Sequence, residues 1–196
     1  IQASWLALLE YKGTDMILLN PATHDHSNNS KGGTVAWQGM PDGAQIQYVE
    51  ATPITVSSTH TTALPVDNTA PGPQNTEGAE VMTVTITPLS ATSKLIVEVA
   101  AHISANIASG TGAWALFRDS GANAVAAGLS TNIGANGALP LPIKYSVVAG
   151  STSATTFKLR VGTHTGAALT FNGENGAGLF DGKMIATMTA TEIKAS

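Results

Sequence analysis

The sequence contains no cysteine, and only 5% of its 196 residues are aromatic and 11% charged. Without cysteine there is no disulfide framework, no thiol nucleophile and no cysteine-ligated zinc finger. Ordinary domains carry about 25% charged residues, so we expect Thr, Ser, Asn and Gly to cover most of this surface. The net charge of -4 argues against nucleic acid as a partner. No apolar run reaches the roughly 18 residues of a membrane span, so membrane insertion is not expected.

Residues 1–20 hold the densest apolar clusters and are predicted to form an N-terminal arm. Trp5, Leu8 and Leu9 share one stripe if the segment is a short helix, and Ser4 is placed to cap it. A helix of about two turns is marginal alone, so the arm, helical or extended, needs a partner surface. That surface is the rest of this chain, a second copy in an oligomer, or another protein.

Residues 21–44 are polar and Gly-rich, a composition typical of a neck or linker. This neck contains His24 and His26, separated by Asp25. In an extended chain both imidazoles project to the same side. A pair of this kind in a polar loop is commonly just solvated, and one chain offers too few ligands for a tight metal site. A metal here therefore requires ligands from further chains.

From Gln45 onward, apolar and polar residues alternate with the period of half-buried antiparallel strands. Gly, Asn, Ser and Pro fill the connections between the alternating segments. The expected strands cover residues 45–51, 54–58, 81–87, 94–103, 113–118, 140–148, 156–161, 168–171 and 183–193. The pattern predicts an all-β fold, an antiparallel β-sandwich that forms a head domain over residues 45–196.

Two of the expected strands are apolar on both faces. Ile96 and Ala100 lie opposite the predicted core face of 94–103, and Ile185 and Ile193 do so in 183–193. Isolated exposed apolar residues are common. An antiparallel sheet with one face in its own core can, however, bury the second face against a partner. We therefore expect an oligomer.

No catalytic motif stands out, and we predict that the protein is not an enzyme. There is no G-x-S-x-G elbow, and the Gly-rich run at 172–178 lacks the Lys and Ser or Thr of a phosphate loop. His60, His102 and His164 form no second site by spacing. Arg118 precedes Asp119, so a structural ion pair is favoured there over a ligand contact.

An ordered set of segments resembles the C-terminal head domain of bacteriophage tail fibres and related virion fibre proteins. The segments are 43–62, 82–103, 114–119, 145–161 and 187–193. The resemblance implies a jelly-roll-like β-sandwich, similar in build to tumour-necrosis-factor and C1q heads, that assembles as a homotrimer at the tip of a fibre. The Pro- and Gly-rich insertion at 67–78 departs from the family pattern.

The neck histidines are similar to a metal-binding H-x-H motif on the axis of some trimeric phage tail fibres, with His24 and His26 at its two positions. Three such chains around a threefold axis would offer six imidazole nitrogens. An octahedral set of nitrogens suits ferrous iron, with nickel or cobalt as alternatives, better than tetrahedral zinc. The resemblance thus implies one metal ion per trimer and no other cofactor.

The function implied is that of a non-enzymatic tail-fibre or tail-tip protein of the virion, which attaches to a glycan or protein of the host surface. The arm would bind other virion proteins. The expected contact loops are 104–112, 130–138, 163–168 and 172–181. The alternative is a capsid decoration, cement or head-fibre protein of the same fold. A polysaccharide depolymerase is less favoured.

Overall fold

The computed structural model describes residues 9–12, 15–18, 36–106, 110–133 and 137–195. The chain divides into two compact units, Ile1–Pro41 and Asp42–Ser196. In the first unit, strands β1 (Leu9–Lys12) and β2 (Asp15–Leu18) pair antiparallel, and a 3-10 turn η1 covers Trp37–Gly39. None of the helical segments in the described part of the chain has the length and apolarity that a membrane crossing requires.

Of the two forms predicted for the arm, helical or extended, Leu9–Lys12 takes the extended one and is a strand rather than the end of a helix. A two-turn helix has few backbone hydrogen bonds to offset its nucleation cost. Pairing with Asp15–Leu18 supplies partners from a neighbouring segment instead. The predicted cap Ser4, with Trp5 and Leu8, lies outside the described residues.

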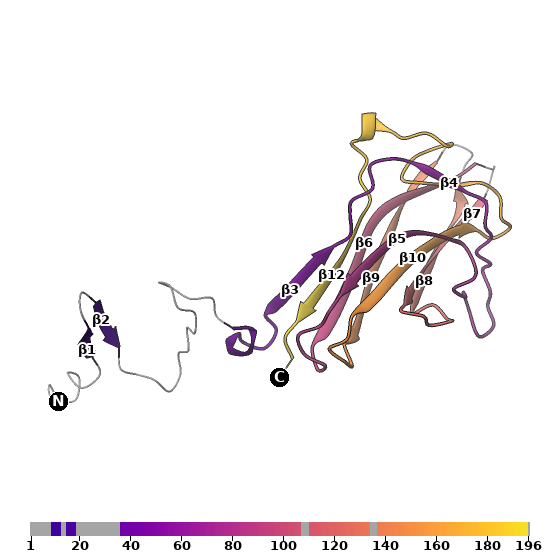
Figure 1. Cartoon of the computed structure of the whole chain (residues 1–196). Helices are drawn as coiled ribbons and strands as arrows, with labels where there is room; N and C mark the ends of the chain where they lie inside the picture. Colours follow the sequence, from indigo (N-terminus) through magenta and orange to yellow (C-terminus); the bar gives the residue numbers. More distant parts are fainter. Residues whose placement is uncertain (1–8, 13–14, 19–35, 107–109, 134–136, 196) are drawn as a thin grey trace. The chain divides into compact units, whose positions relative to one another are not determined.

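The second unit is an antiparallel β-sandwich, as predicted (Figure 1). One sheet has the order β5-β10-β7-β8; the other has β3-β12-β6, with β9 on the far side of β6. These eight strands wind as a jelly roll, in which successive strands mostly alternate between the sheets. The short strand β11 pairs with the end of β6 that lies past β12, and the short strand β4 pairs with β11. The bounds are β3 Gln45–Glu50, β4 Ser58–His60, β5 Ala79–Ile86, β6 Lys94–Ala105, β7 Gly110–Arg118, β8 Ala126–Ile133, β9 Ala138–Val148, β10 Thr155–Thr163, β11 Leu169–Phe171 and β12 Thr187–Ile193.

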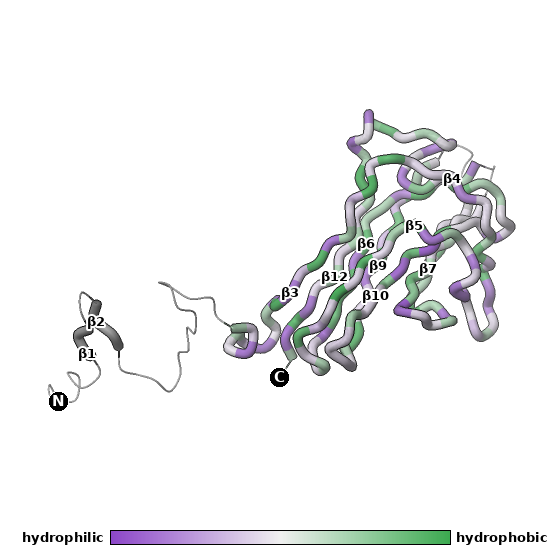
Figure 2. Tube along the Cα trace, viewed as in Figure 1, coloured by the Kyte–Doolittle hydropathy of each residue, from purple (hydrophilic) through white to green (hydrophobic). Residues whose placement is uncertain are grey.

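The core lies between the sheets and follows the predicted alternation. Along β6, Leu95, Val97 and Ile103 are fully buried, and Phe157 and Leu159 of β10 meet them from the other sheet. Figure 2 shows the alternation of hydrophobic and hydrophilic residues along these strands. Burial of each such side chain stabilises the fold by roughly 1.5–3 kcal/mol.

The outer faces of the two sheets differ. The segment that follows β4 packs on the four-stranded sheet, where Leu64 forms a second buried cluster with Ala113, Ala115 and Phe117. The insertion at 67–78 ends in the same layer, because Gly78 donates its N–H to the Ala63 carbonyl. Among the described residues, no such segment covers the outer face of the six-stranded sheet, where Tyr48 is 51% and Val148 58% exposed.

The chain enters and leaves the sandwich at adjacent points. Gly43 donates its N–H to the Lys194 carbonyl at 2.9 Å, and Lys194 donates to the Ala44 carbonyl at 2.9 Å. Because β3 and β12 are antiparallel neighbours, the first and last strands of the sandwich begin and end at the same corner.

Candidate functional site

Loops from both sheets meet at one end of the sandwich, opposite the corner where the chain enters, and we call this region the loop end (Figure 1). The N–H of Asn106 donates to the Ala168 carbonyl at 2.9 Å, and that of His164 to the Thr111 carbonyl at 3.2 Å. The N–H of Val66 donates to His164 Nδ1 at 2.9 Å. Residues 172–181 join them, because the Gly176 N–H donates to Thr170 Oγ1, which in turn donates to Asn106 Oδ1 at 3.2 Å. The structure therefore brings together the loops around 106, 164 and 172–181, three of those expected to contact a receptor.

The predicted loop boundaries need correction. Strand β6 runs to Ala105 and β7 begins at Gly110, so most of 104–112 is strand. The same holds for residues 130–133 of β8, a strand that the sequence did not predict. Its run of Ala, Gly, Ser and Asn has low β-propensity, and pairing with β7 overrides it. Conversely, Ile54 makes only an isolated bridge to Ala186, and the strand of 183–193 starts at Thr187.

Asn172 is the anchor of the loop end. Its residue is 1% exposed, and its Nδ2 donates to the carbonyls of Ile54 at 2.8 Å and Met184 at 3.0 Å. Its own N–H donates to the His102 carbonyl at 2.8 Å. The residue has φ of 53°, a left-handed conformation that Asn tolerates better than other non-glycine residues. One side chain thus fixes both segments that support the tip of the molecule.

The turn after Asn172 is tight and internally bonded. Glu174 and Ala177 exchange two backbone hydrogen bonds of 2.9 and 2.8 Å around Asn175 and Gly176, whose φ values are 48° and 81°. Asn-Gly with two positive φ angles is the preferred sequence of a type I′ turn. Gly176 also donates to Thr170 Oγ1 at 2.8 Å. This part of the loop end is therefore held in one shape.

Phe180 forms the exposed tip. The 3-10 turn η2 (Phe180–Gly182) stands at the far end of the sandwich in Figure 1. Phe180, Asp181 and Gly182 have φ of 56°, 53° and 72°, and Phe180 is 74% exposed. Non-glycine residues in this region cost about 1–3 kcal/mol each and are concentrated at functional sites. The chain therefore bears both backbone strain and an exposed phenyl ring at one point.

A second segment lies beside this tip. Ile54 and Ala186 exchange backbone hydrogen bonds of 3.0 and 2.9 Å, which bring residues 54–56 alongside residues 184–186. Val56 is 70% exposed and Ile185 49% exposed. The segments that flank the tip thus also present apolar side chains.

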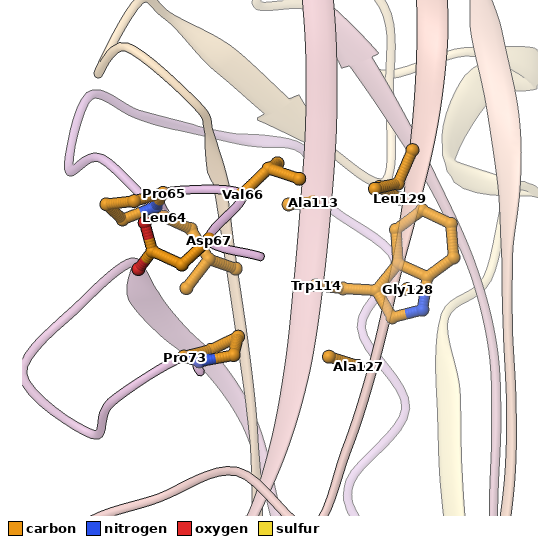
Figure 3. Close-up of a pocket in the computed structure, with 10 residues that line it drawn as sticks. All are labelled: Leu64, Pro65, Val66, Asp67, Pro73, Ala113, Trp114, Ala127, Gly128 and Leu129. Atoms are coloured by element: carbon orange, nitrogen blue, oxygen red, sulfur yellow. The ribbon is translucent and has the colours of Figure 1, made fainter. Parts of the chain in front are cut away.

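A small apolar pocket lies between the segment that follows β4, here Leu64–Pro73, and strand β8 (Figure 3). Its volume is about 170 Å³. Pro65, Val66 and Pro73 line one side, and the Trp114 ring, beside Gly128, lines the other. The pocket has room for one small apolar group, and the Asp67 carboxylate points away from the indole in Figure 3.

The histidines of the sandwich are separate from one another. His60 Nε2 lies 2.9 Å from Ser58 Oγ, and burial lowers the pKa of His60. His164 Nδ1 accepts a backbone N–H, while His102 lies on the outer face of the six-stranded sheet. Within the described ranges, no three His, Cys, Asp or Glu side chains are grouped to hold a metal. The predicted metal ligands His24 and His26 lie outside those ranges.

Arg118 is a structural residue. Its Nε lies 3.5 Å from Asp119 Oδ2, and its Nη2 donates to the Ala149 carbonyl. The guanidinium thereby ties the end of β7 to the turn between β9 and β10.

The comparisons with known proteins give distant likenesses only. No protein-family model and no curated protein matches the chain. One similar solved structure is the EclA C-terminal domain, a sugar-binding protein, with 16% identity over 72% of this chain and 83% of that chain and a TM-score of 0.33. A CBM4 structure has 12% identity over 59% of this chain and 87% of that chain, with a TM-score of 0.28. Infectious bursal disease virus strain Gx has 11% identity over 78% of this chain and 37% of that chain, with a TM-score of 0.28. Because these scores are low, we base the function on the geometry of this chain.

Proposed function

We propose that the protein is a non-enzymatic attachment protein of a bacteriophage virion, whose loop end contacts a glycan or protein of the host surface. The observation that supports this most directly is the tip. A left-handed turn is ordinarily built from Gly, Asn or Asp, and a solvated turn gains nothing from a phenyl ring. Phe180 at φ of 56° and 74% exposure is explained if the ring packs against a partner.

The outer face of the six-stranded sheet, which no segment of the described residues covers, supports assembly, which we propose to be a homotrimer. Tyr48, Val148 and Ile185 are about half exposed on or beside it. Three copies would present three tips, and this multivalency would strengthen a weak single contact. In this proposal the N-terminal arm binds other virion proteins, and His24 and His26 of three chains hold one metal ion. Iron is favoured, with nickel or cobalt as alternatives.

The test is adsorption of the purified full chain to a panel of bacterial envelopes, for wild type, Phe180→Ala and Leu89→Ala. Leu89 is 39% exposed between β5 and β6, at the opposite end of the sandwich, and so makes a matched apolar control. We expect Phe180→Ala to lower adsorption at least about tenfold, as truncation of a central aromatic contact does, and Leu89→Ala to leave it unchanged.

If Phe180→Ala adsorbs as well as Leu89→Ala and wild type, the loop end is not the contact surface. A chain that binds no envelope but binds assembled capsids would instead be a decoration protein. Release of sugars from purified host polysaccharide would show a depolymerase.

A further inference from the structure

A second pocket lies on the outer face of the four-stranded sheet, away from the loop end. Its volume is about 320 Å³, at the lower end of the range for small-ligand sites. Its lining contains four charged side chains of both signs, together with a hydroxyl and an amide. The lining residues are Asn75, Glu80, Phe117, Asp119, Ser120, Lys158 and Arg160. We call it the Lys158 pocket.

Arg160 and Glu80 form a fixed wall of this pocket. Arg160 donates from Nε to the Glu77 carbonyl at 2.7 Å and from Nη2 to the Gly78 carbonyl at 2.8 Å. Its Nη1 lies 3.5 Å from Glu80 Oε2, and Glu80 Oε1 accepts the Thr83 hydroxyl at 2.9 Å. Both charges are therefore compensated and positioned within the protein.

Two further polar groups of the lining are also bonded within the protein. Asp119 Oδ1 accepts the Thr156 N–H at 2.8 Å, and its Oδ2 lies 3.5 Å from Arg118 Nε. Asn75 Nδ2 donates to the Gly121 carbonyl at 3.0 Å. These contacts hold a carboxylate and an amide at the pocket without closing it.

Lys158 differs from the other charged groups of the lining. It is half-buried on β10, paired with Thr83 of β5 and Phe117 of β7. Among the described residues, no hydrogen bond or ion pair involves its ammonium group, although two carboxylates line the same pocket. A half-buried ammonium group that makes none of these contacts, beside preorganised acceptors, favours an anionic ligand that also carries hydroxyl groups.

We propose that the Lys158 pocket binds one carboxylate-bearing sugar unit of a surface polysaccharide, with the sugar carboxylate against Lys158 and ring hydroxyls donating to Asp119 and Glu80. This deepens the proposed function, on which the choice of a polysaccharide rests. The pocket lies on the sheet opposite the proposed trimer face, so assembly leaves it open.

The test is an NMR titration of the full chain with methyl glucuronide, and with methyl glucoside as the neutral probe. The expected result is binding of the glucuronide, with the largest shifts at Asn75 and Ser120, and at least about tenfold weaker binding of the glucoside. Lys158→Gln should weaken glucuronide binding by at least about the same factor. The matched control is Lys183→Gln, which removes the same charge from the exposed segment after η2.

The outcomes separate the pocket from the attachment function. The proposed sugar site is refuted if the two sugars bind equally well. It is also refuted if Lys183→Gln loses binding and Lys158→Gln does not. If Lys158→Gln alters the fold, the position of the shifts in the wild-type titration decides instead. A chain that adsorbs to envelopes through Phe180 but ignores glucuronide refutes only the pocket. A chain that binds glucuronide through Lys158 but adsorbs to no envelope refutes only the attachment function.

Discussion

The backbone of Gly128 lies directly against the indole of Trp114. A Cβ atom at Gly128 would come within 2.7 Å of Trp114 Cε2 and Nε1. The two residues are register partners on β8 and β7, so the ring crosses its neighbouring strand where that strand has no side chain. The wall of the apolar pocket therefore depends on a glycine in a strand.

We predict that Gly128→Ala lowers the free energy of unfolding by about 1–3 kcal/mol, because the added methyl group displaces a buried ring. Urea denaturation measures this. Gly178→Ala is the matched control, since a methyl group there would meet no atom closer than Ser57 Oγ at 3.9 Å. The control should change stability by less than about 0.5 kcal/mol. Equal losses of unfolding free energy in Gly128→Ala and Gly178→Ala would contradict the close contact between Gly128 and Trp114.

Glu192 is a fully buried carboxylate that holds the connection between β5 and β6. Its oxygens accept the N–H of Leu89 at 2.9 Å and that of Ser90 at 3.1 Å. Glu192→Gln places an amide NH2 group among these donors and should cost about 2 kcal/mol of unfolding free energy. In the control, Glu98→Gln removes an exposed ion pair with Lys144 and should cost less than about 1 kcal/mol. If Glu192→Gln lowers the unfolding free energy less than Glu98→Gln does, Glu192 does not hold this connection.

His60 should make stability depend on pH. Burial lowers its pKa in the folded state, so the unfolded state binds the proton first as the pH falls. The resulting loss of folding stability is absent above the unfolded pKa of about 6.5 and grows as the pH falls below it, until the folded His60 also protonates. We expect His60→Gln to lose less stability than wild type between pH 7.5 and pH 5.5 in urea titrations. Parallel curves for the two proteins would contradict this.

The proposed trimer predicts a solution mass near three times 19.9 kDa by light scattering. Val148→Lys, on the outer face of the six-stranded sheet, should give a monomer because it buries an unpaired charge at the interface. Val56→Lys, at the 70% exposed position near the tip, should leave the mass unchanged. A trimer that survives Val148→Lys would move the interface elsewhere.

The proposed metal predicts that purified trimers contain about one iron, nickel or cobalt ion each, removable by chelator. His24→Ala combined with His26→Ala should abolish the metal content while the sandwich stays folded by circular dichroism. An unchanged metal content would refute these two ligands.

The sequence predicted what depends on local alternation. The inward face of β6 follows from Leu95 and its neighbours, because a strand buried on one face repeats every second residue. Strand β8 was missed because its small residues carry no such signal, and Gly128 is explained only by Trp114 of another strand. Tertiary pairing decided both.

The sites were less predictable than the core. Residues 172–181 were predicted as a contact loop from their Gly and Asn content, which is also what permits the turn at Asn175. The sequence did not indicate Phe180 as a contact residue, because the left-handed φ of this phenylalanine is imposed by the surrounding loops and not by its own preference. That Lys158 has no ionic partner among the described residues depends on the contacts of Glu80 and Asp119, and Arg160 and Thr156, which bind these two carboxylates, are distant from them in the sequence.

The paired hydrogen bonds between Gly43, Ala44 and Lys194 hold the two ends of the sandwich domain side by side. Adjacent entry and exit points allow a domain to be spliced into a host protein through two short linkers, or to be circularly permuted. Both junctions would lie at the corner opposite Phe180, so the grafted head would display its tip outward. In the proposed attachment protein, this arrangement would let one scaffold carry heads of different binding preference without altering the strands that hold them.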